Sequence, residues 1–145
     1  AATCRKVAEA KDEGVVEVWG DGEQTRSFLY IDECLEGVER LMNSDFTGPV
    51  NIGSDEMISI NDLVHMVSSI AGKKVRLNHV PGPLGVRGRN SDNRLIKEKL
   101  NWAPSRPLKE GMAKTYEWIN EQVQKQKKSK PQKTKKVLKK KKSRK

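Results

Sequence analysis

Apolar residues recur at every third or fourth position in three stretches of the chain, the pattern of helices with one buried face. The first stretch predicts a helix over 32–43 with a buried face formed by Ile31, Cys34, Leu35, Val38, Leu41 and Met42. Its solvent-facing side carries Glu33, Glu36, Glu39 and Arg40. The other two stretches predict helices over 59–71 and 107–124, with buried faces formed by Ile60, Leu63, Val64, Val67 and Ala71, and by Leu108, Met112, Thr115, Ile119 and Val123.

Four stretches carry the composition of β-strands. Residues 15–19 and 26–31 are rich in β-branched and aromatic side chains, 75–80 alternates with a period of two, and 49–53 is short and apolar on both sides. A strand that is apolar on both sides suits a position inside a larger sheet. Helical composition over 1–11 and a short helix ending at Leu100 complete the predicted elements. Helices interspersed among the strands indicate an α/β or α+β class.

Turn and cap residues define the boundaries of these elements. Gly20-Asp21-Gly22 predicts a tight turn with positive φ. Asp32 is expected to cap the helix over 32–43, and Ser59 with Asp62 resembles a capping box. Ser91 or Asp92 is expected to cap the helix that ends at Leu100. Gly72 and Pro107 stand where a helix ends and where one begins.

The charge of the chain is concentrated at its C-terminal end. Of the 29 basic residues, 12 Lys and one Arg fall in 125–145, which contain no acidic residue. Residues 1–124 therefore hold 16 basic and 19 acidic residues, a net charge of −3. The predicted organisation is a mildly acidic folded part over 1–124 and a Lys-rich disordered tail over 125–145.

Several function classes find no support in the composition. The two cysteines, Cys4 and Cys34, form neither a disulfide framework nor a Cys-x-x-Cys metal motif, and Cys34 is expected to be a small core residue. His65 and His79 are predicted to be surface residues without metal-ligand spacing. No segment approaches the roughly 18 apolar residues of a membrane span. We therefore expect no metal, no membrane partner and a reduced, cytoplasmic location.

Two arginine-bearing turns are the candidates for chemistry. The triplet Gln24-Thr25-Arg26 presents an amide, a hydroxyl and a guanidinium on a short segment. The segment 87–90 presents two more guanidiniums before a predicted helix N-terminus. Arginine side chains bind phosphate oxygens bidentately, so the two turns together are suited to a diphosphate. The alternative is that Arg89 pairs with Asp92 or another nearby acid and only fixes the loop.

Three longer motifs carry a family resemblance: WGDGEQTRSF at 19–28, PVNIGSDEM at 49–57 and PGPLGVRGRNSDN at 81–93. With these motifs, residues 1–124 closely resemble the C-terminal part of the GDP-mannose 3,5-epimerases, a family of extended short-chain dehydrogenases/reductases. The resemblance implies conversion of GDP-mannose to GDP-L-galactose for ascorbate and cell-wall synthesis. The reaction there depends on a tightly held NAD that oxidises and re-reduces C4 of the sugar.

The resemblance also assigns roles to individual residues. Gln24, Thr25 and Arg26 match the family's substrate-contacting triplet, Arg89 matches its arginine for the GDP phosphates, and Lys6 matches a substrate-binding lysine. The family's Gly-rich NAD loop, its Tyr-x-x-x-Lys pair and its acid/base Cys and Lys have no counterpart in this chain. No catalytic residue is therefore carried over, and the NAD-binding Rossmann part is expected to be largely missing.

Two functions follow as alternatives. The first is the substrate-binding portion of a nucleotide-sugar epimerase, a fragment inactive alone that binds a GDP-mannose-type sugar and is completed by an N-terminal chain or a homodimer. The second is an RNA- or ribosome-associated protein built on an epimerase remnant, which binds through the Lys-rich residues 125–145. A tail without aromatic residues predicts no base-specific contacts in that case.

Overall fold

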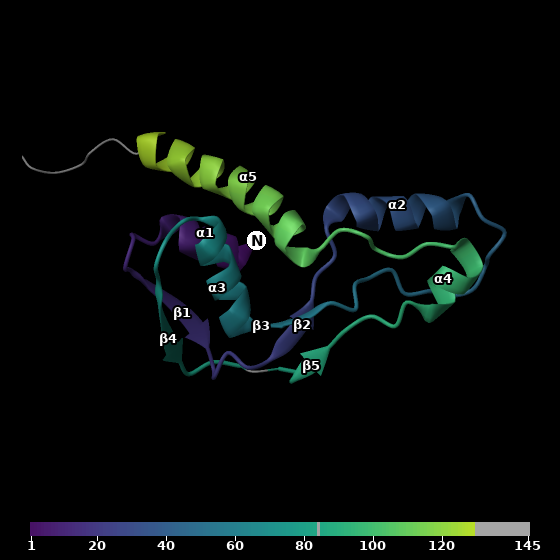
Figure 1. Cartoon of the computed structure of the whole chain (residues 1–145), viewed down its shortest axis with the longest axis horizontal. Helices are drawn as coiled ribbons and strands as arrows, with labels where there is room; N and C mark the ends of the chain where they lie inside the picture. The colour runs from purple at the N-terminus through teal and green to yellow at the C-terminus, as the bar shows by residue number, and fades with distance from the viewer. Residues whose placement is uncertain (84, 130–145) are drawn as a thin grey trace, which may run out of the picture.

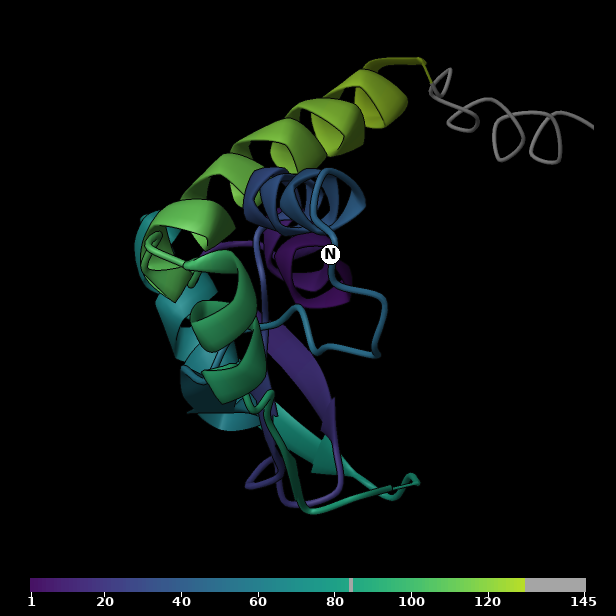
Figure 2. The same cartoon turned by 90° about the vertical axis from the view of Figure 1, so that its right-hand side faces the viewer.

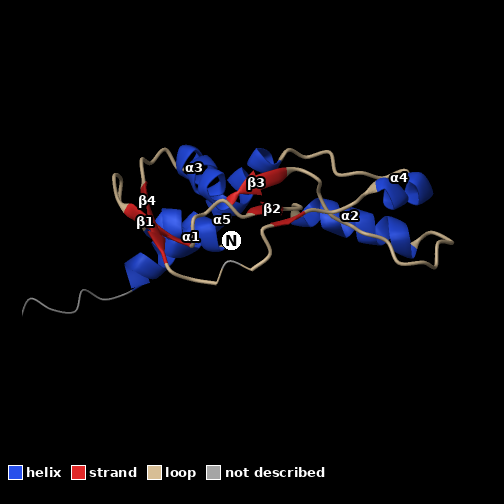
Figure 3. Ribbon diagram, turned by 90° about the horizontal axis from the view of Figure 1, so that it is seen from below, coloured by secondary structure: helices blue, strands red, loops and turns tan. Residues whose placement is uncertain are grey.

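The helices and strands of the computed structural model, which describes residues 1–83 and 85–129, lie along an elongated molecule (Figure 1). Helices α1 (Ala2–Glu9) and α3 (Ile60–Ile70) lie at one end with strands β1 (Val15–Trp19) and β4 (Arg76–Val80). Helices α2 (Ile31–Met42) and α4 (Arg94–Leu100) lie at the other end. A view from below shows the same separation (Figure 3). Helix α5 (Leu108–Ser129) extends over α1.

The main core fills the first end of the molecule. Helices α1, α3 and α5 pack on one another and on the parallel pair β1–β4, in which Val15 is opposite Arg76 and Trp19 is opposite Val80. In Figure 2, α5 runs along the top of the molecule, above α1. The buried side chains of this core are Cys4, Val7, Ala8, Val16, Val18, Leu63, Val64, Val67, Leu108, Met112, Tyr116, Ile119 and Val123. The helices predicted over 59–71 and 107–124 thus bury the apolar faces expected of them, apart from the partly exposed Ile60, Ala71 and Thr115.

A second, three-stranded sheet joins the two ends, with the order β3 (Met57–Ser59), β2 (Thr25–Ser27) and β5 (Gly88–Arg89). Strand β2 pairs antiparallel with β3 and parallel with β5. Neither β3 nor β5 was predicted from the sequence, since strands of two and three residues are too short to show a period. The strand predicted over 26–31 is shorter than expected, because residues 28–30 leave the sheet and α2 begins at Ile31.

The strand predicted over 49–53 is absent, which corrects the sequence analysis. These residues lie beside the segment 91–93 through irregular contacts: Asn51 Nδ2 donates to the carbonyl of Asp92 at 3.3 Å, and Asn93 Nδ2 donates to the carbonyl of Gly53 at 2.9 Å. A strand requires a ladder of backbone hydrogen bonds. No described residue supplies such a ladder to 49–53, so the apolar segment stays irregular.

The buried face of α2 differs from the one predicted, of which only Cys34 and Leu41 are partly buried. Ile31, Leu35, Val38 and Met42 are 58%, 59%, 38% and 79% exposed, whereas Glu33 and Gly37 are buried. Gly37 packs against Trp102 so closely that a Cβ added there would lie 3.3 Å from the indole ring. The described residues provide no apolar partner for the exposed face of α2, and Cys34 on it is only partly buried.

The predicted boundaries are confirmed at α3, at the start of α5 after Pro107, and at the 20–22 turn, where Gly20 and Gly22 have positive φ. They are wrong at the start of α2 and at the end of α5. Ser59 caps α3, because its Oγ accepts from the backbone N–H of Asp62 at 3.0 Å, and Gly72 after that helix has φ of +63°. Asp32 is not the cap of α2, which starts one residue earlier without a side-chain cap. Helix α5 continues to Ser129, so residues 125–129 are helical although the predicted tail starts there. The remainder of that tail, 130–145, lies outside the described residues.

Candidate functional site

Strands β2 and β5 carry a cleft of about 250 Å³ with two arginines in it. Arg26 and Ser27 come from β2 and its end, and Arg89 comes from β5. The rest of the lining consists of Asn51, Ile52, Gly53, Asn90 and Ser91. Segments distant in the sequence therefore meet at one surface, lined mainly by cationic and amide side chains.

The pairing of the strands explains why the two arginines lie together. In the parallel β2–β5 pair, Arg26 is the register partner of Arg89, and register partners project from the same face of a sheet. Two like charges opposite each other are unfavourable in the absence of an anion. Neither guanidinium has an acidic partner among the described residues, and Arg26 Nη1 donates only to the carbonyl of Thr25. The pair is an uncompensated positive site of the kind that phosphate oxygens fill.

The alternative role of Arg89, an ion pair with Asp92, is not what the structure shows. Asp92 instead forms a bidentate pair with Arg94, with the shortest N–O distance at 2.6 Å. The helix expected to start after Ser91 or Asp92 starts at Arg94, and the carboxylate of Asp92 accepts from the N–H of that residue. Arg89 is thus exposed to solvent in the cleft, without an acidic partner among the described residues.

Gln24 and Thr25 precede Arg26 in the chain and do not line the cleft. Gln24 is only 8% exposed, and its Nε2 donates to the carbonyl of Trp19 at 3.2 Å. Its buried Oε1 has no partner among the described residues. Thr25 lies beside Gly88, where an added Cβ would come within 3.0 Å of its Oγ1. Glycine at position 88 therefore lets β5 approach β2 closely.

Lys6 does not join the other predicted site residues. It lies on α1, and its Nζ donates to the backbone carbonyl of Glu17 at 2.8 Å. It does not line the arginine cleft. The structure therefore brings together Arg26 and Arg89, with Thr25 beside them on β2, while Gln24 and Lys6 lie outside the cleft lining.

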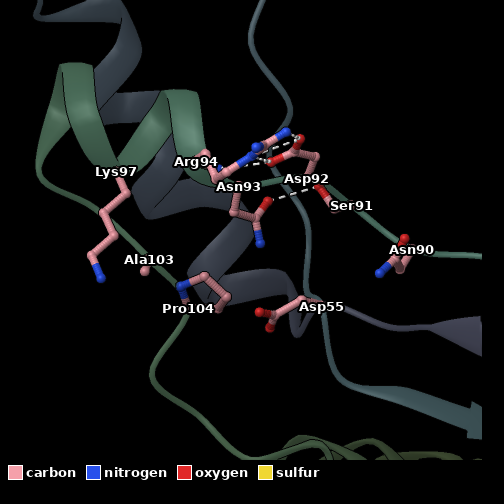
Figure 4. Close-up of a pocket in the computed structure, with 9 residues that line it drawn as sticks. All are labelled: Asp55, Asn90, Ser91, Asp92, Asn93, Arg94, Lys97, Ala103 and Pro104. Carbon is pink, nitrogen blue, oxygen red and sulfur yellow. Dashed lines mark hydrogen bonds and ion pairs between the residues drawn. The ribbon is translucent and has the colours of Figure 1, made fainter.

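A larger depression of about 560 Å³ adjoins the arginine cleft, since Asn90 and Ser91 line both (Figure 4). In Figure 4 the carboxylate of Asp92 faces Arg94, and Asp55 lies across the depression. Lys97 also lines it. Because Asp92 already neutralises Arg94, this depression is less suited to an anion than the arginine cleft, although it adds room for the remainder of a larger ligand.

The Asp92–Arg94 pair leads to a testable pH dependence. The hydrogen bonds from the Arg94 side chain and backbone lower the pKa of Asp92 from 3.8 to about 2. A lowered carboxyl pKa gives a stabilisation that is present above the unfolded value of 3.8 and lost as the pH falls through about 2. The carboxyl carbon of Asp92 should titrate near pH 2 by NMR, and at a higher pH in Arg94→Ala, which loses the side-chain hydrogen bonds and keeps the backbone one. A midpoint near 3.8 in the unsubstituted chain would contradict the ion pair.

Sequence reasoning missed the amide side chains of the site. Asn51 and Asn90 line the arginine cleft, but only the register of β5 and the contacts of 49–53 bring them there. The available signal was Gly88 between two arginines, since a glycine inside a strand indicates a close backbone approach.

Among the described residues, no group of three or more His, Cys, Asp or Glu is arranged to hold a metal. No helix in this part of the chain is long and apolar enough to cross a membrane.

Comparison with known proteins gives these features a context. The NAD dependent epimerase/dehydratase family matches over residues 1–53. The fold matches UDP-glucose 4-epimerase of Thermotoga maritima, solved with UDP-glucose, with a TM-score of 0.76 and 26% identity, over 84% of this chain and 39% of that one. It also matches UDP-glucuronic acid 4-epimerase of Bacillus cereus, solved with UDP-glucuronic acid and NAD, with a TM-score of 0.74 and 27% identity, over 84% and 40%. The chain is thus similar in sequence to the NAD dependent epimerase/dehydratase family and in fold to nucleotide-sugar epimerases.

Within that class, the GDP-mannose 3,5-epimerases match at much higher identity. Over 88% of its own length, the chain is 61% identical to the enzyme of Arabidopsis thaliana and 58% identical to one from Oryza sativa subsp. indica. The resemblance inferred from the motifs at 19–28, 49–57 and 81–93 is thereby confirmed. The chain spans about a third of the length of these curated relatives.

Proposed function

We propose that this chain binds the diphosphate of a GDP-mannose-type nucleotide sugar and serves as part of a GDP-mannose 3,5-epimerase. The observation that carries the proposal is the juxtaposition of Arg26 and Arg89 in one cleft without an acidic partner among the described residues. The high identity to GDP-mannose 3,5-epimerases supports the choice of nucleotide sugar.

In this proposal each residue has a defined task. Arg26 and Arg89 hold the phosphate oxygens, and the Asn51 and Asn90 amides that line the same cleft donate to the remaining ligand oxygens. Thr25 and Gln24 hold the start of β2 in place. The adjoining depression accepts the part of the ligand that extends beyond the cleft. Lys6 is assigned a substrate contact by the resemblance alone, and the geometry of the described residues adds nothing to it.

NAD belongs to the chemistry of the relatives, but the described residues do not fit it. A dinucleotide site requires a strand, a Gly-rich loop and a helix in succession. Here the glycine-containing turn after β1 leads into β2 instead of a helix. We therefore assign no step of the hydride transfer to these residues.

A cytoplasmic location, a role in ascorbate biosynthesis and completion by an N-terminal chain or a homodimer stay predictions.

The RNA-associated alternative finds no support among the relatives identified by sequence and by fold. Most of the basic tail on which it depends lies outside the described residues.

Isothermal titration of the chain with GDP-mannose tests the proposal. Loss of a hydrogen bond to a charged group costs about 1.5–3 kcal/mol, so Arg26→Ala and Arg89→Ala should each raise the Kd roughly 10–100-fold. Arg40→Ala is the matched control, because Arg40 is an exposed arginine of α2 paired with Glu36 and does not line the cleft. No binding by the unsubstituted chain, or equal losses in Arg40→Ala and Arg89→Ala, would refute the proposal.

A further inference from the structure

The turn between β1 and β2 is held by side-chain hydrogen bonds. They join Asp21 and Glu23 of the turn to Arg87 and Asn61. Asp21 Oδ2 accepts from Arg87 Nη1 at 2.7 Å, and its Oδ1 accepts from the backbone N–H of Glu23 at 2.9 Å. Asn61, from the first turn of α3, donates through Nδ2 to the carbonyl of Asp21 at 3.0 Å and to the Glu23 carboxylate at 2.7 Å. The backbone N–H of Asn61 also donates to the carbonyl of Gly22 at 3.0 Å.

The positive φ of Gly22 belongs to the same arrangement. Its φ is +74°, and a Cβ added there would lie 1.9 Å from Asn61 Oδ1. A side chain at this position would therefore displace Asn61 from the turn. Glycine permits both the backbone conformation and the close approach of α3. The turn is thus fixed to α3 on one side and to Arg87 on the other.

This anchored turn is connected directly to the arginine cleft. The backbone N–H of Thr25 donates to the carbonyl of Arg87 at 2.9 Å. Arg87 therefore contacts the β1–β2 segment twice, through its side chain at Asp21 and through its carbonyl at Thr25. Both contacts lie immediately before the register pairs Thr25–Gly88 and Arg26–Arg89.

The register of β5 needs such an anchor. The strand has only two residues, and a slip of one residue would turn Arg89 to the opposite face of the sheet. Repulsion between Arg26 and Arg89 works against the observed register in the absence of an anion. The ion pair at Asp21 opposes this slip, and the Arg87 side chain forms no part of the cleft lining.

We propose that Arg87 is a positioning residue, which through its ion pair with Asp21 sets the register of β5 and so places Arg89 beside Arg26 for phosphate binding. This inference rests on the proposed function for its consequence in binding, while the register itself is independent of any ligand. Nothing in the resemblance assigns this role to Arg87 or Asp21. The lowered pKa of Asp21, caused first by its hydrogen bond from Arg87, agrees with the pairing.

The test has two arms, of which the first uses no ligand. In a ¹⁵N,¹³C-labelled chain, NOEs between the backbones of β2 and β5 should report the Arg26–Arg89 register. We expect these NOEs to be lost in Arg87→Ala and in Asp21→Ala, and to be retained in Arg40→Ala. The charge-swapped double variant Asp21→Arg/Arg87→Asp should restore them, which a general loss of folding would not allow. Unchanged NOEs in Arg87→Ala would overturn the inference.

The second arm measures the Kd for GDP-mannose. Because the ion pair is exposed, Arg87→Ala and Asp21→Ala should each raise the Kd about two- to fivefold. The double alanine variant Asp21→Ala/Arg87→Ala should raise it no more than either alone, since all three remove the same pair. The charge-swapped variant should recover most of the affinity. If Arg89→Ala weakens binding and Arg87→Ala does not, the positioning role is wrong and the proposed function stands. If the unsubstituted chain does not bind, the proposed function is wrong, and the NOEs alone decide the register.

Discussion

Replacing Leu63 by alanine lowers the free energy of unfolding by about 2–5 kcal/mol, the range for removing a buried leucine side chain. Leu63 projects from α3 into the core formed with α1, α5 and the β1–β4 pair, and it is only 3% exposed. The substitution removes apolar burial and leaves a cavity that the packed helices fill only in part. Because small domains have a total stability of about 5–15 kcal/mol, this loss should be evident in a urea titration followed by circular dichroism.

The matched control is the same substitution at an exposed leucine. Leu35 on α2 is 59% exposed, so Leu35→Ala should change the free energy of unfolding by no more than about 0.5 kcal/mol. Equal losses at positions 63 and 35 would show that the apolar face of α2 is covered in solution. That outcome would contradict the burial described here for α2.

Replacing Glu33 by alanine should cost about 3 kcal/mol, because its buried carboxylate serves two backbone donors. Glu33 Oε1 accepts from the N–H of Ser105 at 2.6 Å and from the N–H of Arg106 at 2.8 Å, and the residue is 7% exposed. Removing the acceptor leaves both N–H groups without a partner, and each such group costs about 1–3 kcal/mol. Glu33→Gln retains a neutral acceptor oxygen, so its stability should fall between that of Glu33→Ala and that of the unsubstituted chain.

Glu36→Ala provides the comparison on the same helix. Glu36 is exposed and forms an i,i+4 pair with Arg40, so its loss should cost no more than about 0.5 kcal/mol. Thermal and urea unfolding of the variants Glu33→Ala, Glu33→Gln and Glu36→Ala would be measured together. If Glu33→Ala were no more costly than Glu36→Ala, Glu33 would not be the group that fixes the 105–106 backbone to α2.

The helices show what the apolar period predicts and what it does not. For α3 and α5 it predicted most of the buried face, since the apolar partners of both helices lie in the described chain. For α2 the same reasoning gave the wrong face. Amphipathicity identifies the side that gains most from burial, but a partner must be present to cover it. The burial of Glu33 depends on two N–H groups about 70 residues away, which no local pattern reveals.

The sequence predicted that the two arginine-bearing turns act together, but not the strand pairing that brings them together. Both arginine-bearing segments were identified from residue chemistry, and the structure places Arg26 beside Arg89. The pairing itself depends on a two-residue strand, which has no periodic signal. The sequence also left open whether Asp92 would neutralise Arg89. The choice of Arg94 follows from the loop geometry, in which Asp92 also accepts from the backbone of that residue.

The joining of α1 and β1 to elements far along the chain has a consequence for biosynthesis. The apolar side chains of Val7, Val16 and Val18 are covered only when β4 and α5 have been made. At about 5–20 residues per second, a ribosome takes roughly 6–24 s to synthesise the 120 residues from the end of α1 at Glu9 to the end of α5 at Ser129. During that interval these apolar side chains are open to chaperones and proteases. The rate of translation therefore sets how long these side chains stay uncovered, whatever the stability of the finished fold.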